Sequence, residues 1–538
     1  MAVYQRYAII ALLGALLFLP ALGAVHLFDW DEINFAECAR EMLVTKNYLQ
    51  MQIDYQPFWE KPPLFIWLQV LSMKLFGVNE YAARFPNALV GIATLLSLYY
   101  VGRKVAGERR GLLWMGLYLA SWLPHFYFKT GIIDPLFNLL IFGAVYQFYR
   151  LRTAGRWLAH ALWGGLFLGL AVLTKGPVAL IVSGLCFVVY VVWARSFAGF
   201  KIGRLLAFTA VTLVVSFSWF AVEVARNGWW FVQEFISYQA GLFAQNIADH
   251  EEPWYYHPIV LLIGCFPASL LLIPARSQMA HRRETPEKDF TRWMWILFWV
   301  VLVLFSIVKT KIVHYSSLCY FPITYLAARE LEAILEGRKT LRKGIQIGLL
   351  ALGTVWGLLL VALPIVGLNK EKLIPYIADP FAVGNLQANV PWSYWECLWG
   401  FLYLAGIWTA LWLLRRQPRK GILILFAVQI IAIQATMLHF TPKIEWYSQR
   451  AAIEFFKSKA GQDVYVQSVG YKSYAQLFYT RKMPPGDGVP RTEGWLRTGP
   501  VDKPTFFIAK ITEKEKLLAD PLLEFLGEKA GFVFFKRK

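Results

Sequence analysis

The apolar residues of this chain fall into thirteen long stretches separated by short charged segments. A helix that spans a bilayer needs about 20 mostly apolar residues, and each stretch is close to that length. The stretches cover residues 7–27, 83–102, 111–128, 132–149, 157–174, 177–194, 204–222, 258–274, 293–308, 312–328, 344–366, 395–414 and 421–438. The pattern therefore predicts an α-helical polytopic membrane protein with about thirteen spans.

Basic residues between these stretches favour one orientation in the membrane. The N-terminal segment and every second connection together hold 25 lysines and arginines, whereas the alternate loops hold fewer than half as many. Basic residues concentrate on the cytoplasmic side of membrane proteins. We therefore expect a transmembrane domain over residues 1–438, with a juxtamembrane loop, 28–82, and the tail, 439–538, on the outer side, in the periplasm or its equivalent.

Composition supports a membrane protein and excludes several other classes. The chain is 57% hydrophobic and 17% aromatic, and its mean hydropathy is +0.45. The five cysteines are scattered without metal-binding spacing, and no phosphate-binding glycine loop or dinucleotide motif is present. We expect no nucleic-acid partner and no required cofactor, and an activated donor presented from the membrane fits better than ATP.

Acidic residues concentrate in the segment 28–61, directly after the first apolar stretch. Residues 29–47 have helical periodicity, and Leu64–Phe76 forms a second amphipathic run after two prolines. Carboxylates at the edge of a bilayer are costly to desolvate, so they tend to be paired, hydrated or functional. An alternative is structural: Asp31 and Glu32 could favour the helix dipole, with Asp29 and Glu32 as a capping box.

Charged residues in the other outer loops fall on the same face of the membrane. They are Lys129, Asp134, Lys175, the 249–257 segment with His250, and the Lys309–Tyr315 segment. Each alone could be an interfacial anchor or a snorkelling side chain. Together, these acids and bases suit a substrate that carries a phosphate and a group that needs a base.

The tail 439–538 has more charge and shorter apolar runs than the rest of the chain. Residues 464–469, 505–508 and 532–535 have strand patterns, and helices are predicted at 446–460 and 512–526. We expect a small α/β domain on the outer face. Covering the site and binding an acceptor are both open roles for it.

Three motifs resemble the first outer loop of the aminoarabinose–lipid A transferases. They are Trp-Asp31-Glu32-(x4)-Glu37-x-x-Arg40-Glu-Met, Glu60-Lys61-Pro-Pro-Leu, and Phe76-Gly-Val-Asn-Glu-Tyr-Ala-Ala-Arg84-Phe-Pro. With the protein O-mannosyltransferases, that family belongs to the GT-C superfamily of polyprenyl-phosphate-sugar-dependent glycosyltransferases. Asp134, Lys175, His250 and Tyr315 also resemble the family in order and spacing, so the resemblance covers the whole chain.

The resemblance implies a glycosyltransferase and assigns roles to individual residues. Asp31 would be the catalytic carboxylate, joined by Glu32 and Asp134. The residues implied at the donor phosphate are Lys61, Tyr315, Lys175, Arg40 and Arg84. Glu60 and His250 resemble a pair that can bind Zn²⁺. The implied donor is a sugar on undecaprenyl phosphate, and the implied acceptor is a lipid A phosphate or another periplasmic lipid or glycan.

Two departures from the family leave the sugar and the acceptor open. Phe58 stands where the resemblance implies a tyrosine, and residues 239–245 lack the basic residue of the fourth outer loop. The alternative function is a transporter or flippase of a lipid-linked substrate. A transporter is expected to place its charged residues near mid-span, at broken helices, whereas the charges here cluster at one interface.

Overall fold

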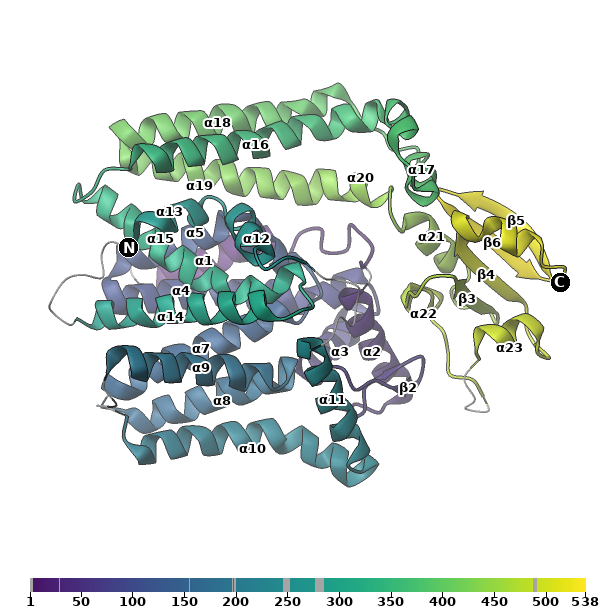
Figure 1. Cartoon of the computed structure of the whole chain (residues 1–538), viewed down its shortest axis with the longest axis horizontal. Coiled ribbons are helices and arrows are strands. Elements are labelled where there is room, and N and C mark those ends of the chain that lie inside the picture. Colours follow the sequence, from purple (N-terminus) through teal and green to yellow (C-terminus); the bar gives the residue numbers. More distant parts are fainter. Residues whose placement is uncertain are drawn as a thin grey trace.

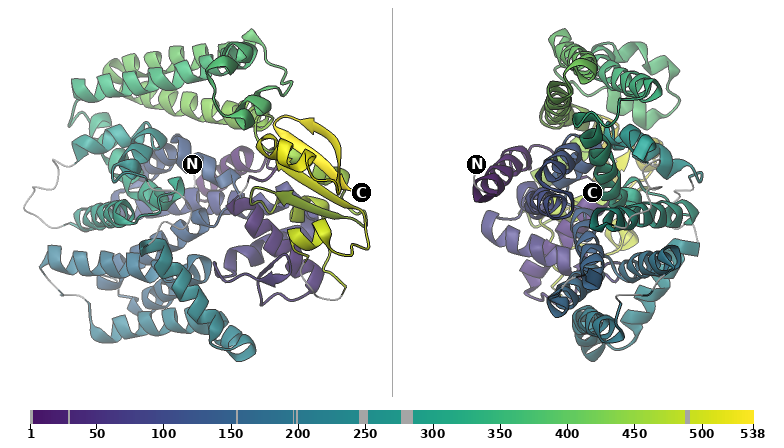
Figure 2. Two further views of the ribbon diagram at one scale, coloured as in Figure 1. Left: turned by 45° about the vertical axis from the view of Figure 1, so that its right-hand side comes forward. Right: turned by 90° about the vertical axis from the view of Figure 1, so that its left-hand side faces the viewer.

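The computed structural model of the protein describes residues 3–28, 30–153, 155–195, 197, 200–244, 252–275, 285–486 and 491–538. Most of the long helices run roughly parallel to one another, and a small sheet lies beyond one end of this bundle (Figure 1). The view along the helices shows them packed side by side (Figure 2). The predicted helical membrane fold is therefore confirmed.

All thirteen apolar stretches contain helices. Their bounds are α1 Val3–Phe18, α4 Glu80–Ala106, α5 Glu108–Leu119, α6 Trp122–Phe126, α7 Asp134–Thr153, α8 Trp157–Lys175, α9 Val178–Ala194, α10 Ile202–Asn227, α12 Tyr256–Gly264, α13 Ala268–Ala275, α14 Pro286–Ile307, α15 Tyr320–Leu335, α16 Lys343–Leu368, α18 Cys397–Arg416 and α19 Pro418–Ala435. Helix α10 exposes large apolar side chains along much of its length, as expected for a helix that faces lipid.

Fewer of these helices than predicted have the length of a full span. Within the described residues, seven are long and apolar enough to cross a membrane, and a bent pair, 122–129 with 134–152, would make an eighth. The two parts of that pair meet at 117°. Helices α1 and α9 are shorter, and the stretch 258–274 is divided between α12 and α13. The apolar pattern therefore located the helices but overestimated how many are continuous spans, because turns interrupt several of them.

The first outer segment folds as two helices joined by a short hairpin. Helix α2 covers Asp31–Thr45, strands β1 and β2 cover Gln52–Ile53 and Gln56–Pro57, and α3 covers Leu64–Phe76. The polar residues Asn34, Glu37, Arg40 and Glu41 fall on one side of α2, yet all four are buried. The reason is that α2 lies between the bundle and the C-terminal region, so both of its sides are covered (Figure 1).

The tail forms a four-stranded mixed sheet with short helices. Its elements are α20 Thr441–Glu445, α21 Arg450–Ser458, β3 Tyr465–Val469, α22 Ala475–Thr480, α23 Glu493–Thr498, β4 Thr505–Lys510, α24 Lys514–Leu518, β5 Leu523–Lys529 and β6 Phe532–Arg537. The strand order is β3-β4-β6-β5; β3 and β4 are parallel, and the other pairs are antiparallel.

The three predicted strands are present, but the helix predicted at 512–526 is wrong in its second half. Helix α24 ends at Leu518, and residues 523–529 form strand β5 instead. Ala530 and Gly531 have positive φ angles of 44° and 79°. Two such residues make a tight hairpin turn, which pairs β5 with β6 and overrides the local helical pattern.

Candidate active site

Four helical segments bring their ends together at the end of the bundle that faces the sheet. Asp31 is the first residue of α2, Asp134 is the first residue of α7, and Lys175 is the last residue of α8. The short 3₁₀ helix Val313–Cys319 brings His314 to the same place. Carboxylates at helix starts and a cation at a helix end are each favoured by the helix dipoles, so the local sequence suits these positions.

Asp134 and Lys175 form a buried ion pair. The Nζ atom of Lys175 lies 2.5 Å from Oδ1 of Asp134. The ammonium also lies 5.0 Å from the ring centre of Tyr315 and 5.6 Å from that of Phe137. The structure thus brings together three of the residues predicted from sequence, Asp134, Lys175 and Tyr315.

His314 lies between the two predicted catalytic carboxylates. Its Nε2 atom is 3.6 Å from Oδ2 of Asp31 and 3.8 Å from Oδ2 of Asp134. The side chain of Asp31 is 28% exposed, whereas that of Asp134 is 2% exposed. Asp31 is therefore the carboxylate that a substrate can reach, and His314 connects it to the buried pair. The sequence analysis did not assign His314, which has no motif of its own.

Lys61 points toward the same cluster from the start of α3. Its Nζ atom lies 5.1 Å from the ring centre of Tyr238, in helix α11 Trp230–Ala244. Burial lowers the pKa of Lys61, and the nearby carboxylates of Asp31 and Glu60 oppose that effect. Within the described part of the chain, no carboxylate lies within ion-pair distance of Lys61. Its charge is therefore available to an anionic ligand.

Glu60 is held by helix α11 rather than by Lys61. The Nε2 atom of Gln239 donates to the Glu60 carbonyl oxygen at 3.0 Å, and burial together with the nearby Glu60 carboxylate raises the pKa of Tyr238 on the same helix. Gln239 belongs to the segment that lacks the basic residue implied by the resemblance. The amide serves here to fix the backbone beside Lys61.

Lys311 is a further cation that the sequence analysis did not assign. It is only 7% exposed, and among the described residues no acidic group or hydrogen-bond acceptor pairs with it. Lys311 and His314 both interact electrostatically with His257 at the start of α12. A buried lysine without a carboxylate partner costs stability. Such a residue indicates a site for an anion. Lys311 could not be recognised from the sequence, because the sequence does not show which lysines are buried.

Glu32 and Arg84 form a separate, buried group. The Nε and Nη2 atoms of Arg84 donate to the Glu32 carboxylate at 3.0 and 2.8 Å, and the guanidinium also donates to the carbonyl oxygens of Leu22, Val25 and His26. Burial alone would raise the pKa of Glu32, but Arg84 and two backbone N–H donors lower it below its ordinary value. Through these contacts the Arg84 guanidinium is bound to other groups of the protein. Glu32 and Arg84 therefore position the chain rather than face a substrate.

Arg40 is similarly engaged inside the protein. Its Nε and Nη2 atoms donate to the Glu37 carboxylate at 2.7 and 2.6 Å, which makes an i,i+3 ion pair on α2. Burial and the neighbouring Glu37 together raise the pKa of Glu41 to about 9. The backbone N–H of Tyr55 donates to Glu41 at 2.9 Å. The structure therefore places Arg40 in a structural network on α2 instead of among the lysines.

The predicted Zn²⁺ pair and capping box extend beyond the described residues. Glu60 is described, but His250 and Asp29 lie outside the described ranges. Among the residues that the structure describes, no group of three or more histidines, cysteines or acids is arranged to hold a metal. A Zn²⁺ site at Glu60 and His250 stays a prediction.

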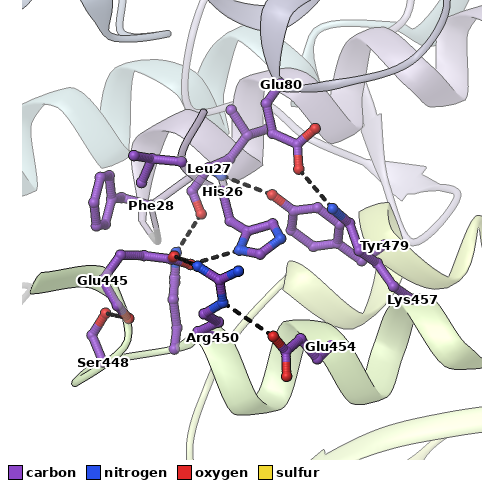
Figure 3. A network of polar contacts seen from close by, with 12 residues as sticks. His26, Leu27, Phe28, Glu80, Glu445, Ser448, Arg450, Glu454, Lys457 and Tyr479 are labelled. Atoms are coloured by element: carbon purple, nitrogen blue, oxygen red, sulfur yellow. Dashed lines mark hydrogen bonds and ion pairs between the residues drawn. The ribbon is translucent and has the colours of Figure 1, made fainter. Parts of the chain in front are cut away.

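The C-terminal region contacts the segment just before Asp31 (Figure 3). His26 Nδ1 lies 2.6 Å from Glu445 Oε1, and the backbone N–H of Leu27 donates to the Tyr479 hydroxyl at 2.7 Å. Lys457 pairs with Glu80 at 3.1 Å. These contacts hold the tail against the start of α2 and against α4. The sheet therefore lies at the same end of the molecule as Asp31 and Asp134.

Comparison with known proteins agrees with this architecture. The chain aligns with the crystal structure of ArnT from Cupriavidus metallidurans bound to undecaprenyl phosphate with a TM-score of 0.78, covering 99% of this chain and 98% of that one at 18% identity. The archaeal oligosaccharyltransferase AglB from Archaeoglobus fulgidus aligns with a TM-score of 0.50 at 10% identity, covering 95% and 70% of the two chains. The chain thus shares its fold with these two membrane proteins.

Sequence relatives narrow the class further. Residues 60–221 match a family described as dolichyl-phosphate-mannose-protein mannosyltransferase. Undecaprenyl phosphate-alpha-4-amino-4-deoxy-L-arabinose arabinosyl transferases from Erwinia tasmaniensis and Pectobacterium carotovorum are 28% and 29% identical over 338 and 388 residues. The matches cover 60% and 70% of this chain, and 59% and 67% of those relatives. The resemblance to aminoarabinose transferases and protein mannosyltransferases is confirmed.

Proposed function

We propose that this protein is an integral-membrane glycosyltransferase that moves a sugar from a polyprenyl-phosphate donor to an acceptor such as lipid A. One observation carries the proposal: Asp31, Asp134, Lys175, His314 and the uncompensated Lys61 converge where helix ends meet. The names of the relatives specify undecaprenyl phosphate and aminoarabinose, so undecaprenyl phosphate is the proposed carrier. The gathering of these charges at one end of the helix bundle, beside the C-terminal domain, favours an enzyme over a transporter.

The reaction requires charge stabilisation on the leaving group. The acceptor oxygen forms a bond to the anomeric carbon, and the bond between that carbon and the phosphate oxygen breaks. The electron pair of the broken bond stays on the polyprenyl phosphate. Lys61 is suited to stabilise that charge because it is partly desolvated and has no described carboxylate partner. Lys175 contributes less, since Asp134 already neutralises much of its charge.

Asp31 has a role that depends on the acceptor. For a hydroxyl acceptor, Asp31 accepts the proton as a general base. For a phosphate acceptor, which is already an anion, it orients the acceptor or stabilises positive charge that develops on the sugar. His314, 3.6 Å away, positions Asp31 in both cases. The proposed catalytic set is therefore Asp31 and Asp134, with Glu32 as a structural residue.

We also propose the orientation and the domain organisation. Residues 1–438 form the transmembrane domain with the loop 28–82, and residues 439–538 form a periplasmic domain of an inner membrane protein. The bias of basic residues supports this arrangement. The native cysteines are all buried, so Asp463→Cys would provide a single reactive thiol. An impermeant maleimide added to spheroplasts should label it, and labelling only after membrane lysis would contradict the orientation.

Transfer itself is the direct test of the proposed function. Purified protein is mixed with undecaprenyl-phosphate-linked sugars and lipid A, and the products are examined by mass spectrometry. The expected product is lipid A with one added sugar residue. Wild type should form it, and so should the control variant Asp463→Asn, because the Asp463 carboxylate is exposed in the tail. Asp31→Asn should form almost none. Absence of transfer by wild type with every donor and acceptor tested would overturn the proposal.

A further inference from the structure

A cavity lies in the C-terminal domain, at the place where this domain contacts the first outer segment. Its volume is about 550 Å³, within the range of about 300–1,000 Å³ that small-molecule sites span. It is lined by Asp54, Gln467, Ser468, Gly470, Tyr471, Lys472, Ser473, Tyr474, Gln476, Leu477 and Glu493. Most of these residues follow strand β3, and Asp54 comes from the β1–β2 hairpin. The cavity is thus built from both sides of the interface.

Lys472 supplies a cation at this cavity. Its Nζ atom lies 4.9 Å from the ring centre of Trp30 and 5.5 Å from that of Tyr474, and these two rings are 5.5 Å apart. Within the described residues no carboxylate pairs with Lys472. The acids of the lining have other partners, because Asp54 pairs with Lys482 at 2.5 Å and Glu493 with Arg497 at 3.9 Å. The unmatched charge of the cavity is therefore positive.

Gln476 supplies an unused polar group. Its side chain is 7% exposed, and its Oε1 atom accepts no hydrogen bond from any described residue. Buried polar atoms are nearly always hydrogen-bonded in folded proteins. The Gln476 oxygen on the wall of the cavity is therefore expected to accept a hydrogen bond from water or from a ligand. Hydroxyl and amine groups are suitable donors on such a ligand.

The cavity also lies next to the proposed reaction centre. Trp30 directly precedes Asp31, and its ring is 42% exposed while contacting Tyr474. Aromatic rings pack well against the C–H face of a sugar, and the adjacent ammonium can pair with an anionic substituent. Hydrogen-bonding walls, an aromatic platform and one free cation together suit a phosphorylated sugar.

We propose that this cavity binds the phosphorylated sugar headgroup of the acceptor lipid and delivers it to Asp31. The proposal rests on the proposed function and gives the C-terminal sheet the task of acceptor recognition. The donor phosphate is bound separately, at Lys61. Acceptor binding and donor binding should therefore respond to different substitutions.

The first test measures acceptor binding without any donor. Binding of lipid A carrying two phosphates is measured in detergent by native mass spectrometry for wild type, Lys472→Ala and Tyr474→Leu. Lys503→Ala is the matched control, because Lys503 lies 5.7 Å from the Tyr465 ring in the same region but lines no part of the cavity. We expect Lys472→Ala to weaken binding about tenfold, the loss of about 1.4 kcal/mol, and Tyr474→Leu to weaken it as well. Equal affinity in all four proteins would overturn the inference.

Two further probes define which part of the lipid is recognised. Glucosamine 1-phosphate should compete with lipid A, because it carries the sugar and the phosphate without acyl chains, whereas inorganic phosphate should not. Failure of glucosamine 1-phosphate to compete at any concentration up to its solubility would contradict headgroup recognition.

Kinetics distinguish this inference from the proposed function. In the transfer assay, Lys472→Ala should raise the KM for lipid A about tenfold and leave the KM for the donor unchanged. A wild-type protein that transfers sugar, with Lys472→Ala kinetically identical to it, would overturn the cavity's role while the glycosyltransferase assignment stands. A wild-type protein that binds lipid A through Lys472 but transfers no sugar would overturn the glycosyltransferase assignment, while the cavity's role in lipid A binding would stand.

Discussion

Arg84 binds the carboxylate of Glu32 through two hydrogen bonds of 3.0 and 2.8 Å, although 52 residues separate them in sequence. This pair makes Arg84 a structural residue, because its remaining donors hold the backbone around residues 22–26. That backbone leads directly into Asp31. The pair therefore sets the position of the proposed catalytic carboxylate without contacting a substrate.

Replacing Arg84 should destabilise the fold. Arg84→Ala leaves the Glu32 carboxylate buried and without its counter-charge, a change that costs about 3–5 kcal/mol. We expect a large fall in Tm of the detergent-solubilised protein. Arg109→Ala, which breaks the exposed pair with Glu336, should change stability by only about 0–1 kcal/mol. A stable Arg84→Ala protein with weakened donor binding would instead support the phosphate-binding role implied by the resemblance.

Asp31→Asn and Asp134→Asn should differ in their effect on stability. Asp31 lies in the first turn of α2 but makes no side-chain cap, so Asp31→Asn should cost at most about 0.3–1 kcal/mol through the helix dipole while transfer falls by orders of magnitude. Asp134→Asn breaks the buried pair with Lys175 and should lower both Tm and turnover. Thermal unfolding and transfer rates, measured on the same samples, check both outcomes. Retained turnover in Asp31→Asn would exclude it as the catalytic carboxylate.

Lys61→Ala should weaken donor binding and turnover. The loss of one charge-stabilising contact typically costs about a hundredfold or more in rate, and Lys61→Arg should recover part of it, because arginine keeps the charge with a different geometry. Lys74→Ala is the control, since Lys74 lies on α3, the helix that follows Lys61, and its Nζ atom lies over the Tyr48 ring. Titration with undecaprenyl phosphate measures the affinities. An unchanged affinity in Lys61→Ala would assign the phosphate to another lysine.

Lys311→Met should lower donor affinity without lowering stability. Removing a mostly buried lysine side chain that has no described acidic partner relieves its desolvation cost, so Tm should stay the same or increase. If Lys311 contributes to the anion site, affinity for undecaprenyl phosphate should fall. The adjacent, exposed Lys309 provides the matched variant Lys309→Met, which should alter neither property. A Lys311→Met protein with reduced Tm and normal donor affinity would show that the lysine has a structural role.

Stability should depend on pH through Glu41. Its pKa is about 9 in the folded protein, against an ordinary value of 4.5, so the folded state binds more protons than the unfolded state between these values. The free energy of unfolding therefore falls as pH rises from about 4.5 to 9, by at most about 1.4 kcal/mol per pH unit. Glu41→Gln should remove this dependence and be the more stable protein at pH 8, as measured by Tm across pH. An exposed change, Glu524→Gln, should leave the profile unaltered.

Local sequence patterns predicted much of the helical fold because apolar stretches and helix-starting prolines act locally. Helix α3, for example, begins at Leu64 directly after Pro62 and Pro63. Strand β5 was missed because its partner β6 and the Ala530–Gly531 turn determine it, not its own periodicity. The burial of the polar side of α2 was not predictable for a similar reason, since the elements that bury it come from distant parts of the chain.

The candidate site was predictable only in part. Motifs or short outer loops contained four of the site residues, Asp31, Lys61, Asp134 and Lys175. Three of them, Asp31, Asp134 and Lys175, meet at the ends of helices. His314 and Lys311 were not assigned, because their significance comes from what surrounds them: two carboxylates for His314, and no described acidic partner for Lys311. Arg40, Arg84 and Glu32 share motifs with the predicted site, yet their partners are within the protein. A motif identifies a group of residues but does not separate those that touch substrate from those that hold the backbone.

The contacts of His26 with Glu445 and of Leu27 with Tyr479 have a consequence for biosynthesis. A ribosome makes residues 26–31 more than 400 residues before it makes the segment that holds them in place. During that interval the nascent chain inserts its helices into the bilayer while the start of α2 lacks these two contacts. The proposed reaction centre therefore reaches its final geometry only after residues 445 and 479 have been made.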